Sequence, residues 1–308
     1  MMRAIRLHKN GGPESLVYED APNPTLKDDQ VLIQVQAAAV TPTEFAWHPT
    51  FHTLAGGPRQ FPIILGHEFS GVVAGIGPAG ADLQIGDLVY GMNDWFIDGA
   101  QAEYCLTVAA SVAPKPMTVH HAQAAVVPIS ALTAWQALVD RAQLSEGQRI
   151  LIHGGAGGVG SFAVQLARHK RAYVITTASA DKMDFMKGLG ADEVIDYRAT
   201  PFETVVRNVD VVLDTVGGET RDRSWGVLKK NGRLVTVAAD AEGKEEQRVR
   251  EVFFIVEPHK QQLVEIARLI DDGVIRPIVG AVFSMDEVHK AYAQKPMRGK
   301  NVLRISGQ

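Results

Sequence analysis

The sequence is short of cysteine, of long apolar runs and of basic clusters, and each shortage argues against a class of protein. The only cysteine is Cys105, so neither an internal disulfide framework nor a multi-cysteine metal site can form within one chain. No segment approaches the roughly 20 consecutive apolar residues that cross a bilayer, so we expect no membrane association. The net charge is −4 and no dense run of Lys or Arg appears, which argues against nucleic acid as a partner. Residues 1–6 do not begin a signal-peptide pattern, and we therefore expect a cytoplasmic protein.

The length and texture of the chain indicate two domains. Its 308 residues exceed what one hydrophobic core usually organises. Up to about residue 115, short strands such as 31–36, 71–74 and 88–90 are separated by Gly, Pro and Asp, which is typical of a compact, mostly antiparallel barrel.

From about residue 119 onward, helices alternate with apolar strands, as in crossover units on a parallel sheet. Strands are expected at 149–153, 173–177, 193–195, 210–214 and 233–237, and helices at 122–140, 158–170, 181–189 and 220–228. A last helix begins near Pro258 and stops at Gly273, and strands at 281–283 and 301–305 follow it. We therefore assign a first domain to 1–118, a second to 119–272, and a return of 273–308 to the first.

A glycine-rich turn marks the strongest candidate site. The run Gly155-Ala156-Gly157-Gly158-Val159-Gly160 follows a buried strand and opens a helix, the context in which such a pattern is informative. Gly155 permits a tight turn, Gly157 lets the backbone approach a diphosphate, and Gly160 lets the helix pack on the strand. The helix N-terminus then presents free N–H groups to the anion. A purely structural turn is the alternative, but the context favours a dinucleotide.

The end of the next strand indicates which dinucleotide binds. NAD-binding domains usually place an acid there, whereas this strand ends Thr176-Thr177-Ala178-Ser179. The hydroxyls of Thr177 and Ser179, with Lys182 nearby, are suited to a 2′-phosphate. Asp181 competes as a ribose ligand, although its place is typical of a helix's first turn, and Lys182 has the alternative of a solvated helix lysine. The sequence favours NADPH.

A zinc site is not expected. A catalytic zinc needs three protein ligands and an open position, and His67-Glu68 supplies two at most. His48 and His52 lie upstream, so a histidine-rich site is chemically open, but a polar histidine lining a pocket is the favoured interpretation.

Together these stretches resemble the medium-chain dehydrogenase/reductase superfamily, specifically its zinc-free NADPH:quinone oxidoreductase-like branch, over essentially the whole chain. The segments that carry the resemblance are 38–44, 66–71, 86–89, 153–160, 190–192, 194–197, 214–218, 253–258 and 298–303. The resemblance implies an α/β protein with a GroES-like β-barrel catalytic domain, a Rossmann domain whose parallel sheet is doubly wound, a cleft between them, and a homodimer.

The resemblance also implies roles for individual residues. Ser179, Lys182 and Tyr197 are expected to face the 2′-phosphate. The remaining cofactor-binding residues are expected to be Thr133, Val216, Val237, Ala238, Phe254 and Ile255 on the nicotinamide side, with Lys300 and Asn301 from the closing motif. Zinc-dependent relatives carry Cys where this chain has Thr41, and their later ligand position falls near Ile129, so only His67 matches. Thr41 also replaces the Asn that is usual in the zinc-free branch.

We therefore expect hydride transfer from NADPH to a small electron-poor acceptor, a quinone, an α,β-unsaturated carbonyl or an aldehyde. Thr41 and His67 are the catalytic candidates, as donors to the oxygen on which charge develops. Glu44, Trp47 and His48 are expected in the substrate pocket, with barrel core as the alternative for Trp47 and a solvated helix start for Glu44. The alternative functions are a zinc-dependent alcohol dehydrogenase and a non-catalytic NADPH-binding sensor.

Overall fold

The structure, a computed structural model, describes residues 1–27, 29–79 and 82–306 and divides into two packing units. Unit 1 comprises Met1–Ile129, Glu257–Gly273 and Pro277–Gln308, and unit 2 comprises Ser130–Val256 and Val274–Arg276. These limits differ from the predicted ones, since residues 119–129 and 257–272 pack in unit 1. The predicted domain assignment itself remains a prediction.

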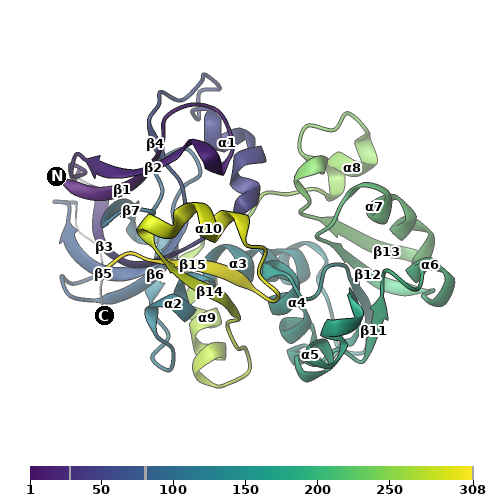
Figure 1. Ribbon diagram of the computed structural model, residues 1–308. Coiled ribbons are helices and arrows are strands. Elements are labelled where there is room, and N and C mark those ends of the chain that lie inside the picture. Colours follow the sequence, from purple (N-terminus) through teal and green to yellow (C-terminus); the bar gives the residue numbers. More distant parts are fainter. Residues whose placement is uncertain (28, 80–81, 307–308) are drawn as a thin grey trace. The chain divides into compact units, whose positions relative to one another are not determined.

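Unit 1 is a mostly antiparallel β-structure built from two sheets (Figure 1). The larger follows the order β14-β15-β3-β5-β6-β8, with β7 also paired to β3, and the smaller follows β2-β1-β4. Its strands are β1 (Met2–Leu7), β2 (Leu16–Ala21), β3 (Gln30–Ala39), β4 (Ile63–Ile64), β5 (Glu68–Ile76), β6 (Leu88–Met92), β7 (Tyr104–Val108), β8 (Val112–Pro114), β14 (Val279–Ser284) and β15 (Lys300–Arg304). Its helices are α1 (His48–Phe51), α2 (His121–Ala125), α9 (Lys260–Asp271) and α10 (Val288–Ala293).

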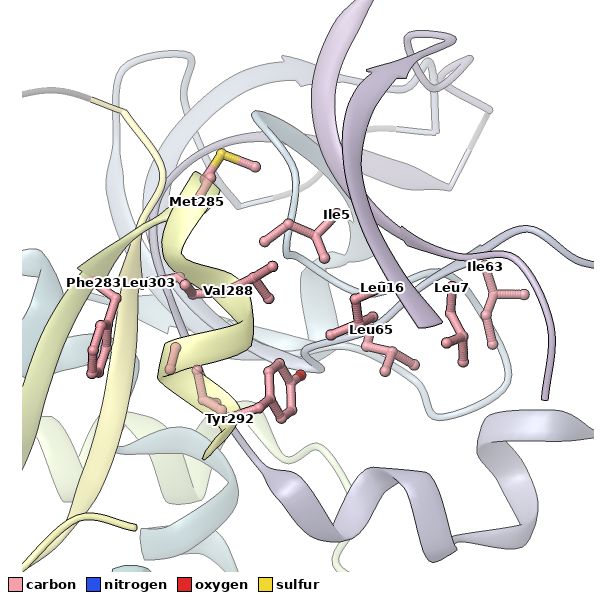
Figure 2. Packing of buried hydrophobic residues seen from close by; sticks show 12 residues of the cluster. Ile5, Leu7, Leu16, Ile63, Leu65, Phe283, Met285, Val288, Tyr292 and Leu303 are labelled. Atoms are coloured by element: carbon pink, nitrogen blue, oxygen red, sulfur yellow. The ribbon is translucent and has the colours of Figure 1, made fainter. Parts of the chain in front are cut away.

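The two ends of the chain meet in unit 1. β15 pairs antiparallel with β3, with Leu303 opposite Ala38, so the C-terminal strand completes a sheet begun by the N-terminal residues. Figure 2 shows the core that this return creates: Ile5 and Leu7 of β1 pack with Val288 and Tyr292 of α10. Burial of such apolar side chains is the dominant stabilising term in folding, so the C-terminal segment is integral to unit 1.

Unit 2 is a five-stranded parallel sheet in the order β11-β10-β9-β12-β13. Its strands are β9 (Arg149–Ile152), β10 (Tyr173–Ala178), β11 (Glu193–Asp196), β12 (Val209–Asp214) and β13 (Leu228–Thr236). Its helices are α4 (Gly158–His169), α5 (Met183–Gly188), α6 (Phe202–Val205), α7 (Gly218–Ser224) and α8 (Gln247–Val252), together with most of α3 (Pro128–Trp135). The α/β class and the parallel sheet expected from the sequence are confirmed.

The strand order of unit 2 contains a switch point, the place where doubly wound sheets commonly bind ligands. From β9 the chain proceeds outward through β10 and β11, then returns to the other side of β9 to form β12 and β13. This reversal is the doubly wound arrangement, and its switch point lies between the carboxyl ends of β9 and β12. The glycine turn follows β9 and the 214–218 loop follows β12, so both loops meet at that point.

Two helix predictions were wrong in detail. The helix expected over 122–140 is divided into α2, α3 and a wider π-type turn at Gln136–Arg141. Pro128 explains the first break, because proline has no N–H to continue a helix and suits the first position of a new one. The last helix begins at Lys260 rather than near Pro258, and the ring of His259 caps it by accepting from the Gln262 amide at 3.3 Å. Its stop at Gly273 is as expected, with φ at +73°.

Near both ends, helix α9 is hydrogen-bonded to other segments of unit 1. The Tyr90 hydroxyl donates to the Leu263 carbonyl at 2.5 Å. At the other end, the Asp271 carboxylate accepts from the amides of Met117 and Thr118, at 3.1 and 2.9 Å, and from the Thr118 hydroxyl at 2.8 Å. Within the described residues, no helix is long and apolar enough to span a bilayer.

The pKa of Asp271 makes this attachment dependent on pH. Partial burial acts to raise it, but the hydrogen bonds from Met117 and Thr118 outweigh burial and hold it below its ordinary value. A depressed carboxyl pKa stabilises the fold above the ordinary pKa, and that stabilisation is lost as the pH falls through the folded-state value. We expect Asp271→Asn to lower the free energy of unfolding by about 1 kcal/mol at pH 7 and by less below pH ~4.

Chemical denaturation at both pH values measures this difference. Asp272→Asn is the matched control, because its exposed ion pair with Arg268 at 2.6 Å should contribute little. Equal losses for the two variants at pH 7 would contradict the role given to Asp271.

Candidate cofactor and substrate site

The glycine turn of unit 2 has the geometry of an anion-binding site. α4 begins at Gly158 with Gly157 before it, and no side chain in the described chain caps its first amides. There is no acid in its first turn either. The unpaired N–H groups and the helix dipole therefore favour an anion at this end of α4.

Three glycines of the turn are required by space or conformation. The positive φ of the turn, +72°, falls at Gly154 rather than at Gly155, where the sequence had placed the tight turn. A side chain at Gly155 would collide with Thr176, and one at Gly160 would collide with the backbone of Gly154. The close packing expected at Gly160 is therefore present. These contacts fit a diphosphate, because the turn lies close against the strand and leaves its amides uncovered.

A buried chain of hydrogen bonds supports this turn from behind. The Ser224 hydroxyl donates to the Thr220 carbonyl at 2.6 Å and lies 3.0 Å from His153 Nε2, so the ring donates to it. The Thr177 hydroxyl accepts from the Gly154 amide at 3.2 Å and lies 3.2 Å from His153 Nδ1. In a neutral ring that donates from Nε2 to Ser224, Nδ1 carries no proton and accepts from the Thr177 hydroxyl.

Burial lowers the pKa of His153 to about 4, which keeps this ring neutral at physiological pH. Thr177 was predicted to hold the 2′-phosphate, yet its side chain is buried and its hydroxyl is engaged with His153 and Gly154. The structure therefore gives Thr177 a structural use beside the glycine turn.

The loop after β12 is held by Asp214, which is fully buried. One carboxylate oxygen accepts from the amides of Val216 and Gly217, both at 2.9 Å, and the other accepts from the Thr236 hydroxyl at 2.8 Å. Val216 itself is exposed at the tip of the loop. The loop follows β12 at the switch point, which is where the sequence analysis expected Val216 to approach the nicotinamide.

The other nicotinamide-side candidates lie in several segments of unit 2. Ala238 and Phe254 are buried, with Arg141 stacked over the Phe254 ring at 4.3 Å. Ile255 is partly exposed, and Thr133 is buried on α3. Val237 lies just beyond β13, bound through its amide to the Asp214 carbonyl at 3.1 Å. Their cofactor contacts remain predictions.

The residues expected at the 2′-phosphate gather at the ends of β10 and β11. The Tyr197 amide donates to the Ala178 carbonyl at 3.2 Å, which places Tyr197 beside Ser179. The exposed Tyr197 ring carries the Arg198 guanidinium at 5.6 Å from its centre. Sequence reasoning missed Arg198, although it directly follows the Val-Ile-Asp-Tyr segment. It also missed the hydrogen bond of Ser179 to Asp181.

The catalytic candidates of unit 1 are organised by Glu44. Its fully buried carboxylate accepts from the amides of Gly66 and His67, at 2.9 and 3.2 Å. The same carboxylate lies 3.5 Å from His67 Nδ1, while His67 Nε2 lies 3.2 Å from the Ile97 carbonyl. Burial acts to raise the pKa of Glu44, but His67 and the two amides outweigh it, so the pKa is lowered. The Glu44 carboxylate is therefore not exposed to solvent, and its contacts position His67.

One aromatic ring lies beside His67 and is itself packed on a second. The Trp95 ring lies 5.1 Å from the His67 ring, and Trp47 meets Trp95 edge to face at 4.8 Å. Thr41 is buried, and its hydroxyl has no hydrogen-bond partner among the residues that the structure describes. His48 is exposed and stacks on His52 at 3.8 Å. Trp95 was not found from the sequence, because no motif surrounds it.

Lys300 and Asn301 use their side chains inside unit 1. The Lys300 ammonium forms a buried ion pair with Glu68, whose other oxygen accepts from the Ile129 amide at 2.9 Å. The Asn301 side-chain amide donates to the carbonyls of Ala291 and Gln294, at 2.9 and 2.6 Å, where α10 ends. Binding of the cofactor by these two residues remains a prediction.

Unit 2 has an uncapped glycine turn at the switch point of a doubly wound parallel sheet, and unit 1 is antiparallel and barrel-like. This combination is typical of dinucleotide-dependent dehydrogenases and reductases. Comparison with known families agrees. Residues 27–131 match the family described as "Alcohol dehydrogenase GroES-like domain", and residues 189–303 match "Zinc-binding dehydrogenase". The chain belongs to the medium-chain dehydrogenase/reductase superfamily, as the sequence resemblance implied.

Individual relatives extend over most of the chain. It is 30% identical to zebrafish (Danio rerio) "NAD(P)H oxidoreductase RTN4IP1, mitochondrial", covering 90% of this chain and 84% of the relative. It is 34% identical to tomato (Solanum lycopersicum) "2-methylene-furan-3-one reductase", covering 88% and 69%. Among solved structures, the quinone oxidoreductase from Coxiella burnetii superposes with a TM-score of 0.89 at 30% identity, covering 99% of both chains.

The residues present do not fit the catalytic zinc that one family description implies. The His67 ring is fully buried; its Nε2 lies 3.2 Å from the Ile97 carbonyl, and its Nδ1 lies 3.5 Å from the Glu44 carboxylate without forming a hydrogen bond. Cys105 is buried, and burial raises the pKa of its thiol to about 12, so it offers no thiolate. Within residues 1–27, 29–79 and 82–306, no three His, Cys, Asp or Glu side chains are grouped to hold an ion.

The neutral state of His153 should be visible in the stability of the protein. An ordinary histidine in the unfolded chain takes up a proton near pH 6.5, but buried His153 does so only near pH 4. Stability is therefore fully present above pH 6.5 and declines as the pH falls toward 4, by about 3 kcal/mol in total. Between pH 6.5 and 4, we expect the unfolding free energy of His153→Gln to fall by about 3 kcal/mol less than that of the wild-type protein.

Denaturant titrations between pH 7 and 4 measure the effect. His169→Gln is the control, because His169 is exposed at the end of α4 and should leave the pH profile as in the wild type. Parallel profiles for the wild type and His153→Gln would refute a buried neutral ring.

The ion pair of Lys300 predicts a second effect on stability. Lys300→Met leaves the Glu68 carboxylate buried without its cation, which should cost about 3 kcal/mol of unfolding free energy. The double variant Glu68→Gln/Lys300→Met should recover part of this loss, because no uncompensated charge remains. Lys290→Met, which removes an exposed pair with Glu287, should cost about 0.5 kcal/mol or less. A Lys300→Met protein as stable as the wild type but weak in NADPH binding would assign Lys300 to the cofactor instead.

Proposed function

We propose that this protein is a zinc-independent reductase that uses NADPH to pass a hydride to a quinone or an α,β-unsaturated carbonyl. The observation that carries the proposal is the uncovered anion-binding turn at 154–160, followed by a β10 end that has hydroxyl and cationic groups and no acid at its tip. Family membership makes the chain an NAD(P)H-dependent oxidoreductase of the quinone and alkenal reductase kind. The choice of NADPH and of the acceptor is the proposal.

The chain's own residues supply binding and orientation on the cofactor side. The amides of 154–160 hold the diphosphate, and Ser179, Lys182 and Tyr197 face the adenosine ribose. The bound nicotinamide supplies the hydride, and an electron-poor carbon needs no metal to accept it. The protein's share is then to fix the cofactor's diphosphate and ribose ends, so that the reacting ring has one orientation.

On the substrate side, Thr41 and His67 supply the polar groups. Negative charge develops on the acceptor oxygen as the hydride arrives, and a positioned donor stabilises it. The buried Thr41 hydroxyl has no hydrogen-bond partner among the described residues, so it is available as a donor to substrate. Glu44 holds His67 through the backbone and the ring, while Trp47 and Trp95 supply apolar surface around it.

The sequence left two alternative functions possible, and the arrangement of the potential zinc ligands bears on one of them. A zinc-dependent alcohol dehydrogenase needs His67 as one of three protein ligands, yet among the described residues no three His, Cys, Asp or Glu side chains are grouped around an ion site. A non-catalytic NADPH sensor would share the glycine turn, so the activity screen below separates it from a reductase. A cytoplasmic location and a homodimer are part of the proposal and rest on the sequence alone.

Activity measurements test the proposed function. We expect NADPH oxidation with 1,4-benzoquinone or with a small enone, unchanged after dialysis against a chelator. Thr41→Val should lower kcat by about tenfold to a hundredfold through loss of the hydroxyl donor, and His67→Gln should lower it over the same range because the amide cannot reproduce the position of the imidazole N–H. Thr107→Val is the matched control, because this buried β7 hydroxyl also has no partner among the described residues.

Tight NADPH binding without turnover on quinones, enones or aldehydes would favour the sensor. Full rates for both Thr41→Val and His67→Gln would remove these residues from the mechanism. Loss of activity on chelation, restored by zinc, would favour the alcohol dehydrogenase.

A further inference from the structure

The ribose end of the cofactor site carries an anion as well as cations. We propose that Asp181 is a specificity-determining residue whose carboxylate limits the preference for NADPH over NADH. This inference rests on the proposed use of NADPH and concerns a residue of the same site. It is carried by one hydrogen bond and by the charges around it.

The hydrogen bond joins Asp181 to the residue that should receive the 2′-phosphate. Ser179 directly follows β10, and its hydroxyl donates to Asp181 Oδ1 at 2.5 Å. Ser179 is buried while Asp181 is exposed, so the carboxylate lies on the solvent side of the hydroxyl. The end of β11 runs beside this point, because the Tyr197 amide donates to the Ala178 carbonyl. Ser179, Asp181 and Tyr197 therefore share one edge of the sheet.

The carboxylate is ionised at physiological pH. The hydrogen bond from Ser179 lowers the pKa of Asp181 below its ordinary value, and the charges of Lys182 and Arg198 lower it further. Arg198 is kept nearby by its contact with the Tyr197 ring. One fixed anion and two cations thus face the same small region.

These groups act in opposite directions on the two cofactors. A 2′-phosphate carries about −1.5 to −2 charges at pH 7, so Lys182 and Arg198 attract it and Asp181 repels it. To donate to that phosphate, Ser179 must also give up its bond to Asp181. A 2′-hydroxyl has the reverse needs, because it can donate to the carboxylate. At the 2′ position of the adenosine ribose, the Asp181 carboxylate therefore disfavours the phosphate of NADPH and favours the hydroxyl of NADH.

The test uses two nucleotides that differ only in the 2′-phosphate, adenosine 2′,5′-bisphosphate and AMP, bound by the whole protein without an acceptor. Asp181→Asn keeps the shape of the side chain and removes its charge. We expect the bisphosphate to bind about tenfold more tightly, an effect that shrinks in high salt, and AMP to bind no more tightly than before. Asp181→Ala should act in the same direction, and Ser179→Ala should weaken the bisphosphate.

Asp286→Asn is the matched control. Asp286 is an exposed aspartate two residues after a serine in a short 3₁₀ turn of unit 1, so the variant changes net charge equally at a different place. It should leave both dissociation constants unchanged. In steady state, the ratio of kcat/KM for NADPH to that for NADH should rise about tenfold in Asp181→Asn alone.

The outcomes separate this inference from the proposed function. An unchanged ratio of bisphosphate to AMP affinity in both Asp181 variants, with AMP still bound, overturns the inference whatever the enzyme reduces. A tenfold shift in that ratio supports it even if quinones and enones are not reduced, and then only the proposed function is lost. A wild-type protein that binds neither nucleotide overturns both.

Discussion

The site in unit 2 depends on the shape of the turn between β9 and α4, and that shape depends on a buried neutral histidine. His153 links Ser224, at the end of α7, to Thr177 on β10 and through it to the Gly154 amide. In this set of hydrogen bonds His153 Nε2 donates and Nδ1 accepts, and the Ser224 and Thr177 hydroxyls each accept one hydrogen bond and donate another. The diphosphate turn, the neighbouring strand and the helix after the 214–218 loop are thereby held in one arrangement. A buried network of this kind fixes geometry because any broken member leaves an unpaired polar group.

Unit 1 uses its buried carboxylates in the same way. Glu44 satisfies two amides and approaches His67, and Glu68 joins Lys300 to the Ile129 amide. From the sequence, Glu44 was a candidate for the substrate pocket and Glu68 was weighed as a zinc ligand. Their engagement with protein donors gives them a structural use, whereas the buried Thr41 hydroxyl is one of the polar groups that have no hydrogen-bond partner among the described residues. Chemistry on the substrate side is then left to few groups.

At the proposed ribose end, the Ser179 hydroxyl donates to Asp181, and the charges of Lys182 and Arg198 act on the same carboxylate. In our proposal the two cations favour a 2′-phosphate and Asp181 opposes it. Because the opposing charges are exposed and near one another, their net effect is small and sensitive to single substitutions. Relatives named for NAD(P)H as well as for NADPH belong to the same superfamily, in keeping with a site that such small changes can adjust.

The sequence by itself determined the main elements. Periodicity located the strands of the parallel sheet, and the glycine run located the turn between β9 and α4 that we propose as the diphosphate site, because both signals are local. It did not reveal the break at Pro128 within a helix-like segment, the use of Thr177 by His153, the pairing of Lys300 with Glu68, or the place of Trp95 beside His67. The break at Pro128 is local and was overlooked, whereas the other three features join residues apart in the chain, such as Lys300 and Glu68 across 232 positions, and no local pattern encodes the partner. Only the tertiary structure decided which polar groups are hydrogen-bonded within the protein and which are available to a ligand, because burial and pairing arise when distant segments pack.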